Sequence, residues 1–246
     1  MTKLAIIGGS GFTQIKELEV TRQQVVNTPF GNPSTPVTFG QFGGIELAFL
    51  PRHGGGHTIP PHMINYRANI WALKEIGAER VISMAAVGGI RKDMAPGCLA
   101  IPDQIIDYTW GRAHTFFEKD LAEVTHVDFT EPYDQELRER LIGAGKSSGV
   151  GVIPDGTYGA MQGPRLESAA EINRMERDGC AMVGMTGMPE AALAREAELS
   201  YAACAVVANW AAGRGDGPIT MEQILAHLEG GLVEAKKLLL AFAAEL

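Results

Sequence analysis

The segment from Pro51 to Lys74, PRHGGGHTIPPHMINYRANIWALK, gathers cationic and imidazole side chains around three consecutive glycines. In a chain of formal net charge −8, this one segment contains Arg52, His53, His57, His62 and Arg67. Glycine N–H groups can approach a ligand closely, and the planar guanidinium of arginine suits a phosphate or carboxylate group. The segment is therefore predicted to bind an anion.

A second candidate anion site follows the first apolar run, where residues 6 to 11 read IIGGSG. A tight glycine turn together with the Ser10 hydroxyl could hold an oxyanion. The spacing is not that of a dinucleotide-binding GxGxxG motif, and the lysine of a P-loop is missing. Strand-end glycines also occur for purely geometric reasons, so the turn alone does not decide between the two roles.

The sequence Met185-Thr186-Gly187-Met188-Pro189-Glu190 predicts a strand that passes into a helix, with Pro189 near the first helical position. The Thr186 hydroxyl and the free N–H groups of a helix start are natural phosphate donors. An ordinary helix cap explains the same residues equally well.

Asn209 ends an apolar run, and a carboxamide at the carboxyl end of a buried strand lies where ligands usually bind in α/β proteins. Asparagine more often has a capping or turn role. Glu167 follows the turn Gln162-Gly163-Pro164-Arg165. An amide and a carboxylate together could recognise the polar edge of a heterocyclic base.

Two other chemistries were weighed for the histidine-rich segment. The HGGG of residues 53 to 56 resembles the oxyanion loop of lipases and esterases, but the GxSxG nucleophile motif of those hydrolases is missing. His53, His57 and His62 could bind zinc, although no carboxylate or thiol accompanies them in the loop. No metal is therefore expected.

The elements that must position these residues alternate along the chain. Continuous apolar runs, typical of strands covered on both faces, occur at 3–7, 37–42, 45–50, 80–85, 99–107, 152–161, 181–184 and 203–209. Helical patterns occur at 63–76, 134–143, 167–178, 189–198 and 220–246. The predicted fold is an α/β three-layer sandwich, a mixed central sheet flanked by helices, in one domain over residues 1–246.

Composition narrows the function classes. The acidic balance argues against a nucleic-acid partner. Cys98, Cys180 and Cys204 are far apart and in apolar surroundings, which is typical of reduced core cysteines in a cytoplasmic protein. No apolar run approaches the roughly 20 residues of a membrane span, and the first residues lack the pattern of a signal peptide. A protein without membrane contact, located in the cytoplasm, is expected.

Six motifs, taken together and in this order, resemble the trimeric nucleoside phosphorylases, specifically the methylthioadenosine phosphorylase branch. They are IIGGSG, PRHGGGHTIPPHMINYRANIWALK, AAVGGI at 85–90, GPRLES at 163–168, GMTGMPEAALAREAEL at 184–199 and the strand that ends at Asn209. The resemblance runs nearly end to end. It implies the nucleoside phosphorylase fold and cleavage of a purine nucleoside by inorganic phosphate, which is a co-substrate, with no cofactor.

The resemblance also implies a role for particular residues. Phosphate would be surrounded by Ser10, Arg52, His53, the Ala86 backbone N–H and Thr186, and Met185 would lie against the ribose. Ala85 departs from the branch, which usually has threonine there, so one hydroxyl contact to phosphate is expected to be missing. His126, in the sequence HVDF, resembles the residue that a neighbouring subunit extends over the pocket. A homotrimer, or a hexamer built as a dimer of trimers, is therefore expected.

Two departures from the branch concern the base. Methylthioadenosine phosphorylases have aspartate where this chain has Asn209, and a second aspartate where it has Ala211. An asparagine can donate to a ring oxygen and accept from a protonated imidazole nitrogen, which matches a 6-oxopurine such as hypoxanthine or guanine. Glu167 agrees, because phosphorylases of inosine and guanosine have glutamate at the matching position and the adenine branch has serine.

The 5′ end of the sugar resembles the methylthio branch instead. Met221 stands where inosine-cleaving relatives have a histidine for the 5′-hydroxyl, and Ile224 and Leu225 extend the apolar face. Such a stripe is more often helix packing, but an apolar wall beside the ribose favours a thioether over a hydroxyl. The combination predicts 5′-methylthioinosine as substrate, with Asn209, Arg52 and His53 in the catalytic roles. The alternatives are methylthioadenosine phosphorylase, a broader purine nucleoside phosphorylase, an HGGG-type hydrolase and a non-catalytic nucleoside-binding protein.

Overall fold

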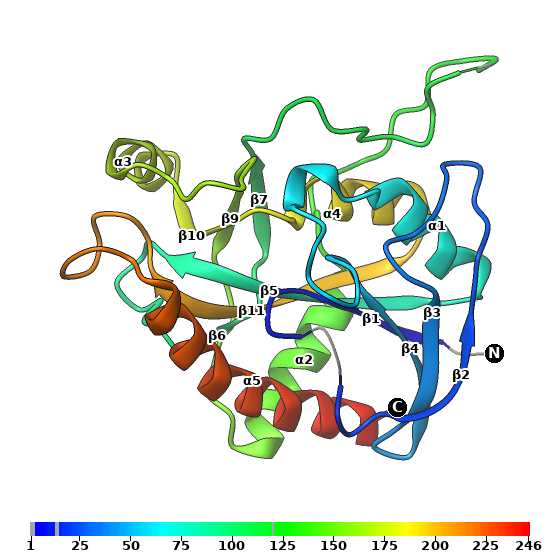
Figure 1. Cartoon of the computed structure of the whole chain (residues 1–246), viewed down its shortest axis with the longest axis horizontal. Coiled ribbons are helices and arrows are strands. Elements are labelled where there is room, and N and C mark those ends of the chain that lie inside the picture. Colours follow the sequence, from blue (N-terminus) through cyan, green and yellow to red (C-terminus); the bar gives the residue numbers. More distant parts are fainter. Residues whose placement is uncertain (1–2, 13–14, 120) are drawn as a thin grey trace.

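A computed structural model describes residues 3–12, 15–119 and 121–246 of the chain (Figure 1). One mixed sheet of 11 strands runs through the molecule, in the order β2-β3-β4-β1-β5-β10-β9-β7. Strand β11 also pairs with β5, and β6 and then β8 follow β11. The strands are β1 Leu4–Gly8, β2 Glu19–Gln24, β3 Val37–Phe42, β4 Ile45–Pro51, β5 Arg80–Gly89, β6 Leu99–Ala100, β7 Gln104–Asp107, β8 Val152–Ile153, β9 Thr157–Ala160, β10 Cys180–Gly184 and β11 Ser200–Trp210.

Helices cover both faces of this sheet. They are α1 Tyr66–Glu75, α2 Gln135–Ser148, α3 Ala169–Arg177, α4 Gly187–Glu196 and α5 Met221–Ala244, with a short 3-10 helix at Pro61–Met63. Figure 1 shows α1 and α4 above the sheet and α2 and α5 below it. The side chains of Ile7 and Leu50 belong to the apolar cluster on the α1 and α4 side, and those of Ile6 and Leu47 to the cluster on the α5 side. The predicted three-layer α/β sandwich is therefore confirmed.

The expected strands were found with small shifts, and two of them were too long. The apolar run 99–107 forms two strands, β6 and β7, and the run 152–161 forms β8 and β9. Pro102 and the sequence Pro154-Asp155-Gly156 explain the breaks, because proline lacks the N–H that a ladder needs. Strand β2 was missed, because all of its residues, EVTRQQ, are exposed and polar enough to hide any apolar pattern.

The helix ends follow ordinary capping chemistry. The Ser168 side chain accepts from the N–H of Glu171, whose carboxylate accepts from the Ser168 N–H, and this capping box starts α3. The Thr220 side chain accepts from the N–H of Gln223 at the start of α5. Both caps lie next to residues that were predicted to contact a substrate, Glu167 and Met221. The local sequence therefore fixes the helix starts beside which these two side chains lie.

The connection from Tyr108 to Asp134 contains no helix or strand among its described residues. It projects from the body of the molecule at the upper right of Figure 1. Its exposed side chains include Trp110, Val124 and Val127, which are 72%, 71% and 40% exposed.

Candidate active site

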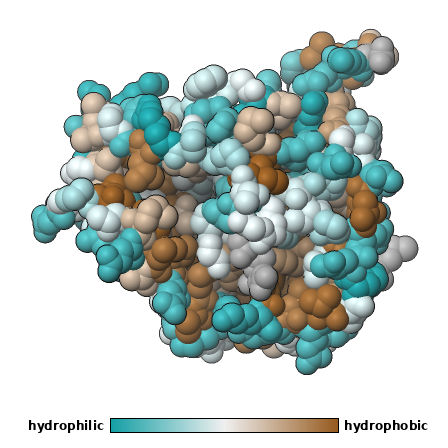
Figure 2. All heavy atoms as spheres, viewed as in Figure 1, coloured by the Kyte–Doolittle hydropathy of each residue, from teal (hydrophilic) through white to brown (hydrophobic). Residues whose placement is uncertain are grey.

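A cavity of about 710 Å³ opens at the ends of several strands, and it brings together residues from most of the predicted motifs. On the face seen in Figure 2, apolar side chains gather in a recessed area between α3 and the start of α5. The predicted site residues that line the cavity are Ser10, Arg52, His53, Ala86, Glu167, Met185, Thr186, Asn209, Met221, Ile224 and Leu225.

Sheet topology explains why these distant residues meet. Strand β1 pairs in parallel with β4 and with β5, and β5 pairs in parallel with β11. The carboxyl ends of these strands therefore lie at one edge, where Gly9 to Gly11, Arg52 and Asn209 follow or end them. Strand β10 runs antiparallel to β5 and pairs Val183 with Gly88, which brings Met185 and Thr186 to the same place.

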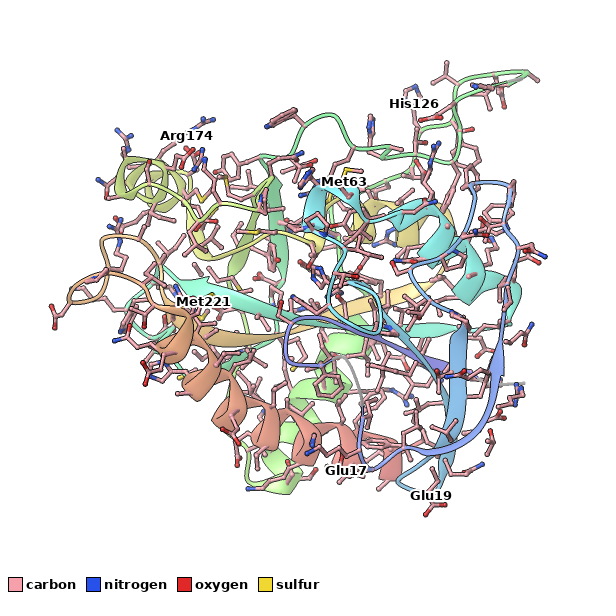
Figure 3. All side chains as sticks on the ribbon, in the orientation of Figure 1. Glu17, Glu19, Met63, His126, Arg174 and Met221 are labelled. Atoms are coloured by element: carbon pink, nitrogen blue, oxygen red, sulfur yellow. The ribbon has the colours of Figure 1, made fainter. Side chains whose placement is uncertain are left out.

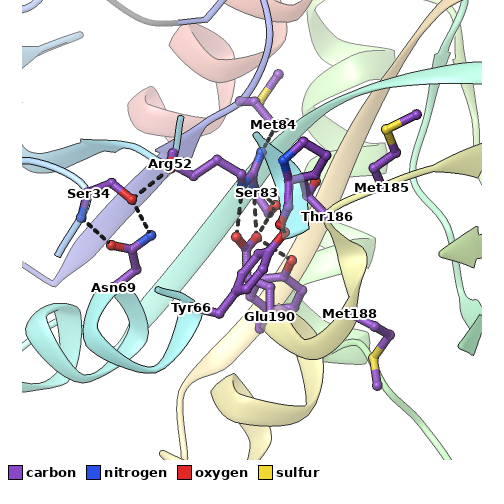
Figure 4. A network of polar contacts seen from close by, with 12 residues as sticks. Ser34, Arg52, Tyr66, Asn69, Ser83, Met84, Met185, Thr186, Met188 and Glu190 are labelled. Carbon is purple, nitrogen blue, oxygen red and sulfur yellow. Dashed lines mark hydrogen bonds and ion pairs between the residues drawn. The ribbon is translucent and has the colours of Figure 1, made fainter. Parts of the chain in front are cut away.

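Arg52 is fully buried and is held by a carboxylate beneath the cavity (Figure 4). Its Nε and Nη2 donate to the two carboxylate oxygens of Glu190 at 2.9 and 2.7 Å. Nη1 donates to the Met84 carbonyl at 2.6 Å, and Nη2 also donates to Ser83 Oγ at 2.5 Å. Glu190 accepts further bonds from Ser83 Oγ at 2.6 Å and from the Tyr201 hydroxyl at 2.8 Å.

This network corrects the expectation of a free arginine fork for the anion. The two-nitrogen edge of Arg52 is occupied by Glu190, so the guanidinium can offer a ligand only its Nη1 side. A side chain at Gly9 would place its Cβ 2.8 Å from Nη1, and glycine keeps that approach open. Because both charges are buried, removing one partner would cost about 3–5 kcal/mol.

His53 is 7% exposed and lines the cavity as a neutral ring. Burial and the neighbouring Arg52 charge lower the pKa of His53 to about 4. Its Nδ1 lies 2.8 Å from the Ile59 carbonyl oxygen, which can only accept, so Nδ1 carries the proton. Nε2 is then a hydrogen-bond acceptor, which suits a protonated oxygen of phosphate.

The glycine triplet does not line the cavity, contrary to the expectation that its N–H groups face a ligand. Gly54 adopts φ 80° and its carbonyl accepts from the His57 N–H, so the triplet makes a turn. The turn carries His57 back to the cavity, where its Nε2 lies 3.4 Å from Ser10 Oγ. His62 and Arg67 lie outside the cavity, and Arg67 pairs with Glu118 at 2.6 Å.

The HGGG-type hydrolase is not supported by this geometry. The Ser10 to His57 contact is long, and within the described part of the chain no carboxylate contacts His57 to orient it. Ser10, His57 and an acid therefore do not form a catalytic triad.

The proposed base-recognition residues, Asn209 and Glu167, are distant in sequence from the anion motifs but line the same cavity. Asn209 Nδ2 donates to the Trp210 carbonyl at 2.7 Å, which identifies the amide nitrogen and leaves Oδ1 as the acceptor. Glu167 is 9% exposed, and burial raises the pKa of its carboxyl. An amide and a partly desolvated carboxylate can together recognise a ring with both N–H and C=O groups.

The first turns of α5 form an apolar wall. Met221 and Leu225 line the cavity and are 66% and 58% exposed, whereas Leu228, one turn on, is 3% exposed. Core packing therefore does not account for Met221 and Leu225. Thr186 precedes α4 without a side-chain cap bond, and the regular helix starts at Pro189 because Met188 is extended.

His126, which was predicted to contact a substrate, also does not line this cavity. It lies in the projecting connection, and Figure 3 shows it on the opposite side of the view from Met221. The prediction that it belongs to a neighbouring subunit's pocket is not tested by a single chain.

Several residues of the site were missed in the sequence. Ser83, Tyr201 and Arg112 lie outside the six motifs, and Glu190 lies within one of them but gives no sign of its partner. All four are buried, and their importance depends on contacts across the fold. His57 did carry a signal, since it lies four residues after His53 in the same motif.

Across residues 3–12, 15–119 and 121–246, no group of three or more histidine, cysteine, aspartate or glutamate side chains is arranged to hold a metal. Within the same residues, no helix is long and apolar enough to cross a membrane.

Comparison with known proteins agrees with the geometry. The family model of the Phosphorylase superfamily matches residues 3–244. A probable S-methyl-5′-thioinosine phosphorylase of Xanthomonas campestris pv. campestris is 55% identical over 227 residues, covering 92% of this chain and 91% of that protein. A 6-oxopurine nucleoside phosphorylase of Pyrococcus furiosus is 46% identical, covering 98% and 92% of the two chains.

A solved structure extends the comparison to the fold. Methylthioadenosine phosphorylase from Schistosoma mansoni, in complex with adenine, superposes with a TM-score of 0.94 at 33% identity, covering 99% of this chain and 91% of that one. The match is nearly complete in both chains. On these grounds the chain is an enzyme of the Phosphorylase superfamily, of the purine nucleoside phosphorylase type.

Proposed function

We propose that the chain cleaves 5′-methylthioinosine with inorganic phosphate, releasing hypoxanthine and 5-methylthioribose 1-phosphate. The observation that carries the proposal is that one cavity contains the anion-binding, base-recognition and apolar residues together. Several relatives at 51–55% identity are named probable S-methyl-5′-thioinosine phosphorylase, which supports the same substrate.

Phosphate would bind among Ser10, Arg52, His53, Ala86 and Thr186. The Nη1 side of Arg52 would donate to one oxygen, and neutral His53 Nε2 would accept from a protonated one. A phosphate oxygen then attacks the anomeric carbon as the bond from that carbon to the purine breaks. Holding the two reactants in line supplies much of the acceleration, and the cavity's fixed dipoles stabilise the charge that develops.

The purine leaves with the electron pair of the broken bond. The proton that phosphate gives up balances the proton that the base gains at its imidazole nitrogen. Asn209 Oδ1 would accept from that N–H, and the free Nδ2 proton would donate to the 6-oxo group. Glu167 would accept from the N–H of the six-membered ring.

The sugar would lie against Met185, and its methylthio group against Met221, Ile224 and Leu225. An apolar wall binds a thioether without leaving a hydroxyl unpaired. No cofactor takes part in this reaction, and phosphate is a second substrate.

A second candidate is methylthioadenosine phosphorylase, which the similarity to the Schistosoma mansoni enzyme favours. It would need aspartate-like chemistry at Asn209, and the carboxamide there cannot supply a proton that moves to the base. This alternative is therefore second.

The proposed assembly is a homotrimer, or a hexamer of two such trimers, in the cytoplasm. The projecting connection with His126, and its exposed Val124 and Val127, would then cover the cavity of a neighbouring copy.

The reaction class is tested by incubating the purified protein with 5′-methylthioinosine, with and without phosphate, and identifying both products by mass spectrometry. The proposal predicts hypoxanthine and the sugar 1-phosphate only when phosphate is present. Hypoxanthine together with free methylthioribose in phosphate-free buffer would show a hydrolase instead.

A further inference from the structure

Arg112 is a buried residue that lies outside the six motifs and does not line the cavity. It is 8% exposed, and its guanidinium makes hydrogen bonds to three separate segments of the chain. Nη1 donates to the carbonyls of Met185 at 2.8 Å and Met188 at 2.5 Å. Nη2 donates to the carbonyls of Met161 at 3.2 Å and Gln162 at 2.8 Å, and Nε donates to Gln162 Oε1 at 3.1 Å.

A third segment is reached through a tyrosine. Arg112 Nη1 donates to the Tyr66 hydroxyl at 3.2 Å, and that hydroxyl donates to the Pro61 carbonyl at 2.8 Å. Pro61 lines the cavity. The guanidinium carbon also lies 5.4 Å from the centre of the Tyr66 ring.

Each of these segments forms part of the cavity wall. Met185 and Thr186 lie in the first, and Pro164, Leu166 and Glu167 follow closely after Gln162 in the second. Among the residues that the structure describes, Arg112 has no carboxylate partner, and all of its acceptors are neutral. Burying a charge costs free energy unless its hydrogen-bond donors are paired. The neutral acceptors around Arg112 therefore stabilise its buried guanidinium.

We propose that Arg112 is a positioning residue that fixes the sugar-contacting and base-contacting segments relative to each other. It also stands at the start of the projecting connection, two residues after Trp110, whose N–H donates to Gln162 Oε1 at 3.1 Å. The connection that carries His126 is thereby anchored to the same carbonyls as the cavity wall. The expected effect of Arg112 on catalysis rests on the proposed nucleoside cleavage. Its role in holding the two segments in place does not.

Arg112→Lys tests the proposal, because lysine keeps the charge but has three donors and no planar fork. The matched control is Arg177→Lys, since Arg177 is exposed and its Nε donates to the Asn173 carbonyl of its own helix. Hydrogen exchange is measured on both proteins without any ligand. We expect amides in residues 161–167 and 185–188 of Arg112→Lys to exchange roughly tenfold faster, while those of β1 and β4 keep wild-type rates.

Kinetics supply the second measurement. For Arg112→Lys we expect the KM for 5′-methylthioinosine to rise about tenfold with a smaller change in kcat, because Arg52 and His53 belong to a segment that Arg112 does not contact. Uniformly faster exchange throughout the protein, or no change in the two segments, would overturn the proposal. So would a loss confined to kcat.

Tyr66→Phe removes only the hydroxyl and serves if the lysine variant does not fold. It should speed exchange of the Ile59 and Met63 amides, which lie on either side of the two prolines, while the amides of 185–188 keep wild-type rates. Equally faster exchange in both segments would contradict the described connection. If the wild-type protein fails to cleave methylthioinosine, the proposed function fails, but the exchange experiment still decides the role of Arg112.

Discussion

Among single residues, we propose that the orientation of the Asn209 amide sets the choice of base. The Asn209 Nδ2 bond to the Trp210 carbonyl leaves Oδ1 facing no described donor, so the side chain presents an acceptor and one remaining N–H. Glu167 adds a buried carboxylate to the same cavity. A 6-oxopurine satisfies this set of groups, and adenine leaves part of it unpaired.

Asn209→Asp should shift base preference toward adenine, because a protonated aspartate can donate to the imidazole nitrogen. We expect the ratio of kcat/KM for methylthioinosine to that for methylthioadenosine to fall roughly ten- to hundredfold, equivalent to about 1–3 kcal/mol. Steady-state assays of both nucleosides measure it. Asn173→Asp, an exposed change on α3, is the control, and an unchanged ratio in Asn209→Asp would remove the proposed role of the amide.

His53 gives a pH prediction with a definite sign. Burial and the Arg52 charge lower its pKa in the folded protein to about 4, below the ordinary histidine pKa of about 6.5, so the unfolded chain takes up a proton first as the pH falls. The stability that this residue contributes is complete above pH 6.5 and is lost as the pH falls toward 4. Urea unfolding at pH 7, 6 and 5, at one protein concentration, should show a steeper loss for the wild type than for His53→Gln. Parallel losses would mean that His53 is not buried as a neutral ring.

Much of the anion site could be read from residue types, but its electrostatics could not. Arg52, His53, Ser10 and Thr186 were all predicted and all line the cavity. Glu190, 138 positions from Arg52 along the chain, was not foreseen as its partner, because a single glutamate on a helix is ordinary and only the fold brings the two charges together.

Among the elements, we propose that helix α5 selects the 5′ group of the substrate. Its first turn carries Met221, an exposed apolar residue on the cavity wall, directly after the Thr220 cap. The stripe of apolar residues predicted the helix correctly. Only the exposed fractions of Met221 and Leu225 distinguish a ligand wall from core packing.

Met221→His should improve cleavage of inosine relative to methylthioinosine, because histidine can pair with a 5′-hydroxyl. We expect the inosine to methylthioinosine ratio of kcat/KM to rise about tenfold, or roughly 1.4 kcal/mol. Val233→His, on an exposed part of α5 outside the cavity, is the matched control. Equal ratios in the wild type and Met221→His would place the 5′ group elsewhere.

Sequence patterns predicted the buried strands and missed the exposed strand β2. β1, with every residue buried, gave a continuous apolar signal, whereas β2 has every residue exposed and gave none. The length of an apolar run did not reveal that it contains two strands. A proline within the run did mark the break, as between β8 and β9.

At the scale of the whole molecule, the site is assembled from segments between Gly9 and Leu228, so no part of the chain holds it alone. The match of the family model over residues 3–244 is consistent with this distribution. The prediction of a single domain over 1–246 stays a prediction. Sequence motifs could indicate which segments meet, but the parallel pairing of β1, β4, β5 and β11 was needed to show why.

The projecting connection gives a prediction about assembly. Light scattering should report a mass of three or six times the 26.3 kDa of one chain. His126→Ala should keep that mass and lower kcat/KM for methylthioinosine roughly tenfold, because the residue is proposed to contact a neighbour's substrate. Full activity in a 26.3 kDa species would contradict the shared site.

The proposed substrate has a 6-oxopurine base and an apolar 5′ group. A competition between three nucleosides tests the recognition of both features at once. Equal concentrations of methylthioinosine, methylthioadenosine and inosine are mixed with phosphate and a limiting amount of enzyme, and loss of each nucleoside is followed by chromatography. We expect methylthioinosine to disappear first, roughly tenfold or more faster than each competitor. Faster consumption of methylthioadenosine or of inosine would contradict it.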